Sequence, residues 1–194
     1  VVTIADSFTA NEIQVRLNIT KPSLLFTQDV LLRGGKTLDL YKKIKEADAP
    51  KTVVIKVSDA QISLRKKDLY FSDFLVDNDS FETVIQNPDD TITILFSSGT
   101  TGEPKAIPWT HTTPIKGASD GYYHHDIHKN DVVCWPTNLG WMMGPWLVFA
   151  ALINKASIAL YYDAPMGDEF GAFVQNAKVT MLGVVPSIVR QWKI

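Results

Sequence analysis

The alternation of short β-branched runs with helical periods constrains the fold of this chain more than any other feature. Helical periods lie near residues 9–20, 38–45, 112–126, 143–153, 167–176 and after Pro186, and strand-like runs lie at residues 23–27, 52–57, 91–96, 132–135, 157–162 and 179–184. Strands separated by helices at this spacing favour a largely parallel sheet covered on both faces. We therefore predict an α/β fold. Thr9 or Asn11 is the candidate cap of the first helix, Pro22 ends that helix, and Gly34-Gly35 predicts a turn. Residues 58–90 are more polar and less periodic, so we expect variable surface structure there.

Composition and charge exclude several functional classes. Hydrophobic residues make up 45% and charged residues 21% of the 194, which is ordinary for a globular protein. The net charge is −2 and no basic stripe is present, so nucleic acid is not an expected partner. The longest apolar run, residues 142–153, is too short to cross a bilayer, and we expect no transmembrane segment. The single cysteine, Cys134, is interpreted as a buried small side chain in an intracellular protein.

The beginning of the chain reads as the middle of a larger fold. Residues 1–5 are typical of a strand end that runs into a helix start, and no targeting segment is visible in the sequence. No internal repeat, low-complexity tract or interdomain linker interrupts the sequence. We interpret residues 1–194 as one partial domain, truncated at both ends.

The stretch from Phe96 to Lys105, Phe-Ser-Ser-Gly-Thr-Thr-Gly-Glu-Pro-Lys, indicates the chemistry. It follows a predicted strand, and open α/β sheets bind ligands beyond the carboxyl ends of their strands. Gly99 and Gly102 let backbone amides approach a ligand closely, and Lys105 adds a cation. The hydroxyl side chains in the same stretch are Ser97, Ser98, Thr100 and Thr101. Amides, hydroxyls and one cation together predict a polyphosphate cradle, the alternative being a solvated turn with an incidental lysine.

The P-loop of kinases and GTPases does not fit this stretch. That motif places four residues between its glycines and ends in Gly-Lys-Ser/Thr. Here two residues separate Gly99 from Gly102, and Lys105 follows Pro104.

The order of residues resembles the phosphate-loop signature of the adenylate-forming (AMP-binding) superfamily, which holds acyl-CoA synthetases, luciferases and peptide-synthetase adenylation domains. The usual form is Tyr/Phe-Thr/Ser-Ser-Gly-Thr/Ser-Thr-Gly-x-Pro-Lys-Gly, and only the last position differs, where Ala106 replaces glycine. Residues 137–144, Thr-Asn-Leu-Gly-Trp-Met-Met-Gly, are similar to the Asp-x-Gly-Trp-x-x-Gly stretch of acetyl-CoA-synthetase-like members, with Asn138 in place of Asp. Residues 4–8 and 104–111 most resemble plant acyl-activating enzymes of the peroxisomal type.

The resemblance implies part of the N-terminal domain of an acyl-CoA synthetase, an acid–thiol ligase, with the C-terminal domain absent from this sequence. Such an enzyme uses ATP and Mg²⁺ to convert a small carboxylic acid into an acyl-adenylate, and coenzyme A then takes the acyl group. Its phosphate-binding residues here would be Ser97, Ser98, Gly99, Thr100, Thr101, Gly102 and Lys105. Lys105 and Thr101 are the candidate catalytic residues, and Thr101 is the candidate Mg²⁺ contact.

Trp141 and Gly144 match positions near the acyl pocket of the related synthetases. For both residues, ordinary packing is an equal alternative. His124 and His128 share one face of a predicted helix, but no third ligand is evident, so we interpret them as a solvated helix end.

Two other functions stay open. One is an adenylation domain that passes its acyl group to a carrier protein, and the other is a nucleotide-binding protein without catalysis. The superfamily's adenine, ribose and catalytic-lysine motifs do not occur in these 194 residues, so the chain alone is expected to be inactive. The resemblance leaves the compartment open between the peroxisome and, as the alternative, the cytoplasm.

Overall fold

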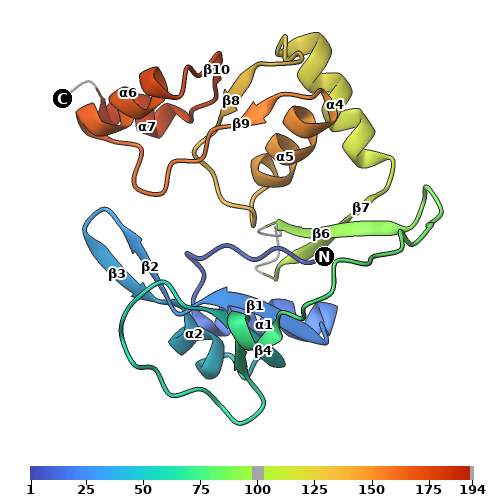
Figure 1. Cartoon of the computed structure of the whole chain (residues 1–194), viewed down its shortest axis with the longest axis vertical. Helices are drawn as coiled ribbons and strands as arrows, with labels where there is room; N and C mark the ends of the chain where they lie inside the picture. Colours follow the sequence, from blue (N-terminus) through green and yellow to red (C-terminus); the bar gives the residue numbers. More distant parts are fainter. Residues whose placement is uncertain (98–102, 193–194) are drawn as a thin grey trace.

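The computed structural model describes residues 1–97 and 103–192 and arranges them in two α/β parts with a β-hairpin between them (Figure 1). The hairpin consists of β6 (Thr91–Ser97) and β7 (Lys105–Thr110). Residues before the hairpin form the lower part of Figure 1, in blue and teal, and residues after it form the upper part, in yellow to red. The alternation of strands and helices confirms the predicted α/β class.

The lower part is built on a three-stranded parallel sheet with the order β1-β4-β5. Its strands are β1 (Leu24–Gln28), β4 (Lys51–Ile55) and β5 (Leu69–Tyr70), and its helices are α1 (Ala10–Thr20), α2 (Leu40–Glu46) and α3 (Phe71–Phe74). Apolar side chains of α1 and α2 and of the turn after α2 pack into one cluster: Ile13, Leu17, Ile44, Ala47 and Ala49. This cluster fixes both helices against the sheet.

Helix α1 begins and ends where its sequence predicts. The Thr9 hydroxyl accepts a hydrogen bond from the Glu12 amide at 3.3 Å, and the Glu12 carboxylate accepts one from the Thr9 amide at 2.8 Å. This reciprocal capping box satisfies two amides that would otherwise lack partners. The helix ends at Lys21, whose φ of 44° lies in the left-handed region, directly before Pro22.

A short hairpin follows β1 and was not predicted. It pairs β2 (Val30–Arg33) with β3 (Lys36–Asp39) around the turn at Gly34 and Gly35, whose φ angles are 56° and 69°. The sequence predicted the turn correctly because glycine adopts positive φ at little cost. It placed the next helix too early, since Leu38 pairs with Leu31 and α2 begins only at Leu40.

The upper part is built on a second parallel sheet with the order β10-β8-β9. Its strands are β8 (Val132–Cys134), β9 (Ser157–Ile158) and β10 (Met181–Leu182), and its helices are α4 (Thr113–His124), α5 (Met143–Ile153), α6 (Gly167–Asn176) and α7 (Pro186–Gln191). The core lies where α5 packs on the sheet and on α4, and its buried members are Ile127, Val133, Trp146, Leu147, Ala150, Ala151 and Ala156. Cys134 is 1% exposed, as predicted, and burial raises the pKa of its thiol.

The predicted parallel pairing is therefore present, but it occurs in two separate sheets. The β2–β3 and β6–β7 hairpins are additional and antiparallel. The strand β7 was missed because Pro108 interrupts its run. Proline lacks an N–H group, which restricts it to positions where the ladder needs no donor. No helix in residues 1–97 and 103–192 is both long and apolar enough to span a membrane.

Asp29, at the β1–β2 junction, is a buried carboxylate that ties the lower sheet to the segment after β4. It is 2% exposed and accepts hydrogen bonds from the amides of Val30 and Val57 and from the amide and hydroxyl of Ser58, at 2.8–3.1 Å. Burial opposes ionisation of Asp29, but these hydrogen bonds outweigh it and hold the pKa below its ordinary value.

Asp68 is the centre of a second buried network. Its carboxylate accepts hydrogen bonds from Arg65 Nε at 2.7 Å, from the Tyr41 hydroxyl at 2.7 Å and from the Thr52 amide at 2.9 Å. The side chain is 0% exposed, and the Arg65 guanidinium also donates to the carbonyl oxygens of Ala49 and Pro50. The expectation of variable surface structure is wrong for this stretch, because these contacts anchor it to α2 and β4.

Candidate functional site

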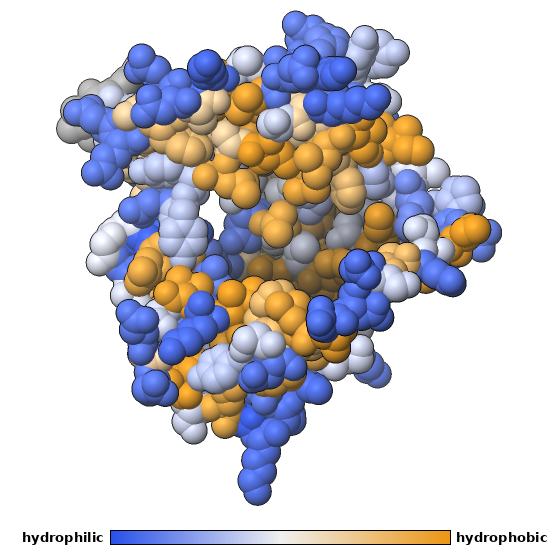
Figure 2. Space-filling view, viewed as in Figure 1, coloured by the Kyte–Doolittle hydropathy of each residue, from blue (hydrophilic) through white to orange (hydrophobic). Residues whose placement is uncertain are grey.

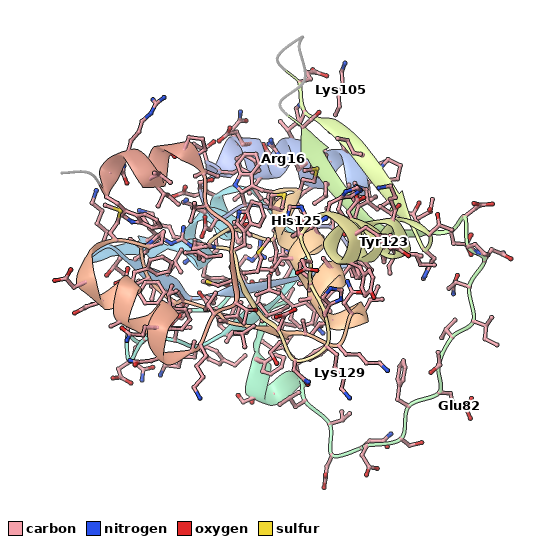
Figure 3. All side chains as sticks on the ribbon, turned by 90° about the horizontal axis from the view of Figure 1, so that it is seen from above. Arg16, Glu82, Lys105, Tyr123, His125 and Lys129 are labelled. Carbon is pink, nitrogen blue, oxygen red and sulfur yellow. The ribbon has the colours of Figure 1, made fainter. Side chains whose placement is uncertain are left out.

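The hairpin holds both ends of the predicted phosphate loop. Ser97, the last residue of β6, pairs with Lys105, the first residue of β7. Figure 3 shows Lys105 at this end of the hairpin, with its side chain pointing away from the body of the molecule. The intervening candidates, Ser98, Gly99, Thr100, Thr101 and Gly102, lie outside the described residues. The structure thus fixes where the loop starts and where it ends.

The strand that leads into the loop is anchored by buried side chains. Leu95 and Phe96 are 4% and 6% exposed, and they pair with Ile107 and Ala106 across the hairpin. Ser97 is half-buried and Lys105 is exposed. A half-buried hydroxyl and an exposed cation thus lie opposite each other at this end of the hairpin, and both are groups that can bind an anion.

The N-terminal segment connects β6 to the second stretch that resembles the superfamily. The amide of Ile94 donates to the Val1 carbonyl at 2.9 Å, and Val2 forms a parallel bridge with Ile94. At its other end the segment touches Gly140 so closely that a Cβ there would overlap the backbone of Ala5. The N-terminal segment therefore contacts the phosphate-loop strand at one end and the stretch of residues 138–144 at the other.

Trp141 lies on the surface beside this contact. It is 46% exposed, and its ring meets that of Phe8 edge-to-face at 5.6 Å between centroids. The Trp141 amide donates to the Asn138 carbonyl at 3.0 Å, which fixes the loop before α5. An aromatic ring that is half exposed and held from one side is suited to form a pocket wall.

Gly144 is buried in the first turn of α5. Its amide donates to the Trp141 carbonyl at 2.9 Å, and a Cβ on it would lie 2.5 Å from the Asn138 carbonyl oxygen and 2.6 Å from Leu139 Cα. Both of these atoms belong to the backbone, which cannot move away as a side chain can. Packing of the loop on α5 thus explains the glycine, whatever its role toward a substrate.

We predict that Gly144→Ala destabilises the chain by about 1–3 kcal/mol, the usual penalty for overpacking a tight site. Thermal unfolding followed by circular dichroism measures the effect. Gly171 is the matched control, because it lies inside α6 with no atom within 4 Å of its added Cβ. Gly171→Ala should be neutral or stabilising, since alanine favours a helix by about 1 kcal/mol over glycine. Equal behaviour of the two variants would contradict the proposed close contact.

His124 is the last residue of α4 and its side chain is 73% exposed, as expected for a solvated helix end. His128 lies beyond the helix, so the expectation that both histidines share one helix face is wrong. The His128 side chain is 43% exposed, with Nε2 at 2.7 Å from Asp126 Oδ1. Within the described ranges, 1–97 and 103–192, no three His, Cys, Asp or Glu side chains form a metal-binding group.

Sequence reasoning missed an open pocket of about 540 Å³ between the β2–β3 hairpin and residues 161–169. It is lined by Leu32, Arg33, Gly35, Lys36, Thr37, Tyr161, Tyr162, Asp163 and Glu169. The amide of Gly34 donates to Asp163, which lowers the pKa of that carboxyl and joins the two parts of the molecule. Figure 2 shows the molecule hollowed between its upper and lower parts, with hydrophobic residues (orange) around the hollow. The sequence signalled only a turn at Gly34 and Gly35, so no pattern pointed to the pocket.

Comparison with known proteins identifies the family. The sequence model of the AMP-binding enzyme family matches residues 1–193. The chain belongs to the AMP-binding enzyme family. The resemblance drawn from the loop is thereby confirmed.

Plant members of the AMP-binding family are similar over the whole chain. A hexanoyl-CoA synthase of Cannabis sativa is 56% identical over 200 residues, which cover all of this chain and 28% of that protein. A probable peroxisomal acyl-activating enzyme 17 of Arabidopsis thaliana is 51% identical over 200 residues, with the same coverage of both proteins. The chain thus spans 28% of the length of these relatives.

Solved structures agree with the predicted fold. Acetoacetyl-CoA synthetase from Streptomyces lividans superposes with a TM-score of 0.81 and 26% identity, over 94% of this chain and 29% of that one. A luciferase-like enzyme from the mealworm Zophobas morio superposes with a TM-score of 0.75 over 96% of this chain and 41% of that one, and its 20% identity supports the fold alone.

Proposed function

We propose that this chain is part of the N-terminal domain of an AMP-forming acyl-CoA synthetase, in which it binds the triphosphate of ATP. One observation carries the proposal: the sequence from Phe96 to Lys105 matches the superfamily signature at every position, and the pairing of Ser97 with Lys105 holds both ends. The similarity to proteins named as CoA synthases and acyl-activating enzymes supports it.

The chemistry needs positioning and charge stabilisation rather than an acid–base pair. The carboxylate of the acid attacks the α-phosphate of ATP, the bond to the β-phosphate breaks, and pyrophosphate leaves with its negative charge. Lys105 would stabilise that charge, and the hydroxyls of the loop would orient the β- and γ-phosphates. Hydroxyl oxygens are also ligands that Mg²⁺ accepts, so Thr101 would contact the ion that enters with ATP. Coenzyme A then attacks the acyl-adenylate and AMP leaves.

Trp141 and Gly144 are proposed to lie along the acyl group. The exposed surface of Trp141 would contact the acyl chain, and Gly144 would keep the loop before α5 close to the helix. We propose a peroxisomal location from the names of the relatives, with the cytoplasm as the alternative.

Exchange of labelled pyrophosphate into ATP by the full-length protein tests the function. We expect exchange that requires both a carboxylic acid and Mg²⁺, and that stops when EDTA is added. Acetate, hexanoate, a long-chain acid and an aryl acid form the panel. Absence of exchange with every acid would favour the non-catalytic alternative.

The acceptor requires a second assay on the same protein. Thioester should form when coenzyme A is added to the enzyme with its acyl-adenylate. If thioester forms only with a carrier protein, the adenylation-domain alternative is correct. The 194-residue chain alone should give no thioester, because the superfamily's adenine, ribose and catalytic-lysine motifs are not among its residues.

A further inference from the structure

Arg16 is a cation buried between the first helix and the hairpin. It is 6% exposed, and its guanidinium carbon lies 3.7 Å from the centroid of the Phe8 ring and 5.4 Å from that of Phe96. Its Nη1 donates to the Glu12 carbonyl at 2.8 Å, whereas Nε has no hydrogen-bond partner among the described residues. Figure 3 labels Arg16 in the interior of the molecule.

Stability gives only a weak reason for a charge at this position, because the attraction of two aromatic rings is set against the cost of desolvating the charge. Burial lowers the pKa of the guanidinium, which nevertheless stays protonated at neutral pH. Within residues 1–97 and 103–192 Arg16 forms no ion pair, although the charge of Glu12 acts on it from a distance. The cost of desolvating such a cation is high, and an apolar side chain of the same size is often neutral or stabilising in its place. Ile13 and Leu17, on the same face of α1, show that the surroundings accept apolar side chains.

The neighbours of Arg16 belong to the two parts of the candidate site. Phe96 directly precedes Ser97, where the phosphate loop begins, and Phe8 contacts the ring of Trp141. A continuous row of contacts, called the stack below, thus runs from the proposed acyl-pocket wall to the phosphate-loop strand through Trp141, Phe8, Arg16 and Phe96. The guanidinium lies within reach of both the Phe8 and the Phe96 ring, and a cation attracts the electron-rich faces of aromatic rings.

We propose that Arg16 is a positioning residue for adenylation, which sets the phosphate-loop strand relative to the acyl-pocket wall through Phe96 and Phe8. The inference rests on the proposed function. In-line attack requires the carboxylate and the α-phosphate to meet within a narrow range of distance and angle, and small displacements slow such reactions strongly. The second half-reaction involves no triphosphate, so it depends much less on where the phosphate loop begins.

The experiment measures both half-reactions in the full-length enzyme carrying Arg16→Met, Arg16→Lys or Phe8→Leu. Pyrophosphate exchange reports adenylation, and thioester formation from preformed acyl-adenylate reports thiol transfer. Arg16→Met should fold about as stably as the wild type, because relief of the desolvation cost offsets the lost cation–π contacts. It should slow exchange by about 2- to 30-fold, if the positioning is worth as much as those contacts. Arg16→Lys keeps the charge without the planar group, so its loss should be smaller. Thiol transfer should change much less than exchange in all three.

A double variant and a matched control separate positioning from general stability. Arg16→Met combined with Phe8→Leu should lose no more than the larger single effect, because both break the same stack. Arg65 is the control, since it is a second largely buried arginine but lies in the Asp68 network. Arg65→Met should lower the melting temperature and leave the ratio of the two half-reactions unchanged.

Two results overturn the inference: unchanged exchange in folded Arg16 variants, or equal losses in both half-reactions. If Arg16→Met does not fold, Arg16→Lys and Phe8→Leu decide by the same criterion. Absence of exchange in the wild type overturns the proposed function itself, and the inference falls with it.

Discussion

Lys105→Ala in the full-length enzyme is expected to slow adenylation by about 10- to 150-fold, because a hydrogen bond to a charged group contributes roughly 1.5–3 kcal/mol. The lysine stands at the exposed end of β7, opposite Ser97, and its proposed role there is that of a point charge on the phosphates. Thiol transfer from preformed acyl-adenylate should change much less, since no triphosphate takes part. Single-turnover assays of the two half-reactions measure the contrast.

Lys129→Ala is the matched control for this prediction. Lys129 is also exposed, and Figure 3 shows it on the side of the molecule away from Lys105. Both half-reactions should keep their wild-type rates in this variant. Equal losses in the two half-reactions of a folded Lys105→Ala enzyme would show that Lys105 does not bind the phosphates.

Asp68→Ala is expected to destabilise the chain by about 3–5 kcal/mol, because it leaves the buried charge of Arg65 without its partner. The Tyr41 hydroxyl and the Thr52 amide lose their acceptor in the same step. Urea unfolding followed by circular dichroism measures the change. Asp73→Ala, in exposed α3, is the control and should stay within about 0.5 kcal/mol of the wild type.

The stabilisation that Asp68 contributes should also depend on pH, and it should decrease as the pH falls. Burial raises its pKa, but hydrogen bonds from Arg65, Tyr41 and Thr52 outweigh burial, so the folded pKa lies below the ordinary value. A group with a lowered folded pKa stabilises the protein above its unfolded pKa of about 4, and that stabilisation is lost as the pH falls through the folded pKa. The stability difference between wild type and Asp68→Asn should therefore shrink in acid. A difference that grows below pH of about 4 would contradict the ionised network.

The sequence predicted features that depend on neighbouring residues. Thr9 was one of two predicted caps for α1, and the structure selects it over Asn11; the glycines at 34 and 35 specify their turn. The phosphate loop was recognised because its ten positions are contiguous. For the same reason both ends of the candidate site were located before the structure placed them in one hairpin.

Features that depend on distant residues were not predicted. Thr52 and Asp68 are 16 positions apart, and only the pairing of β4 with β5 brings them together. Pro108 concealed β7, so the hairpin that supports the loop was read as a loop alone. Arg16 did leave a signal: it lies on the apolar face of α1, three positions after Ile13 and one before Leu17. A charged residue at a helical position whose neighbours on the same face are apolar is expected to be buried, so its contacts decide its role.

Because Cys134 is buried, the reactivity of its thiol reports local opening of the structure. The thiol is the only one in the sequence, and it lies in β8, the central strand of the upper sheet. A thiol reagent reaches it only when that sheet separates, so the alkylation rate measures how often the upper part opens. The Asp68 network lies in the lower part. Alkylation of Asp68→Ala thus distinguishes a protein whose two parts unfold together from one in which each part opens alone.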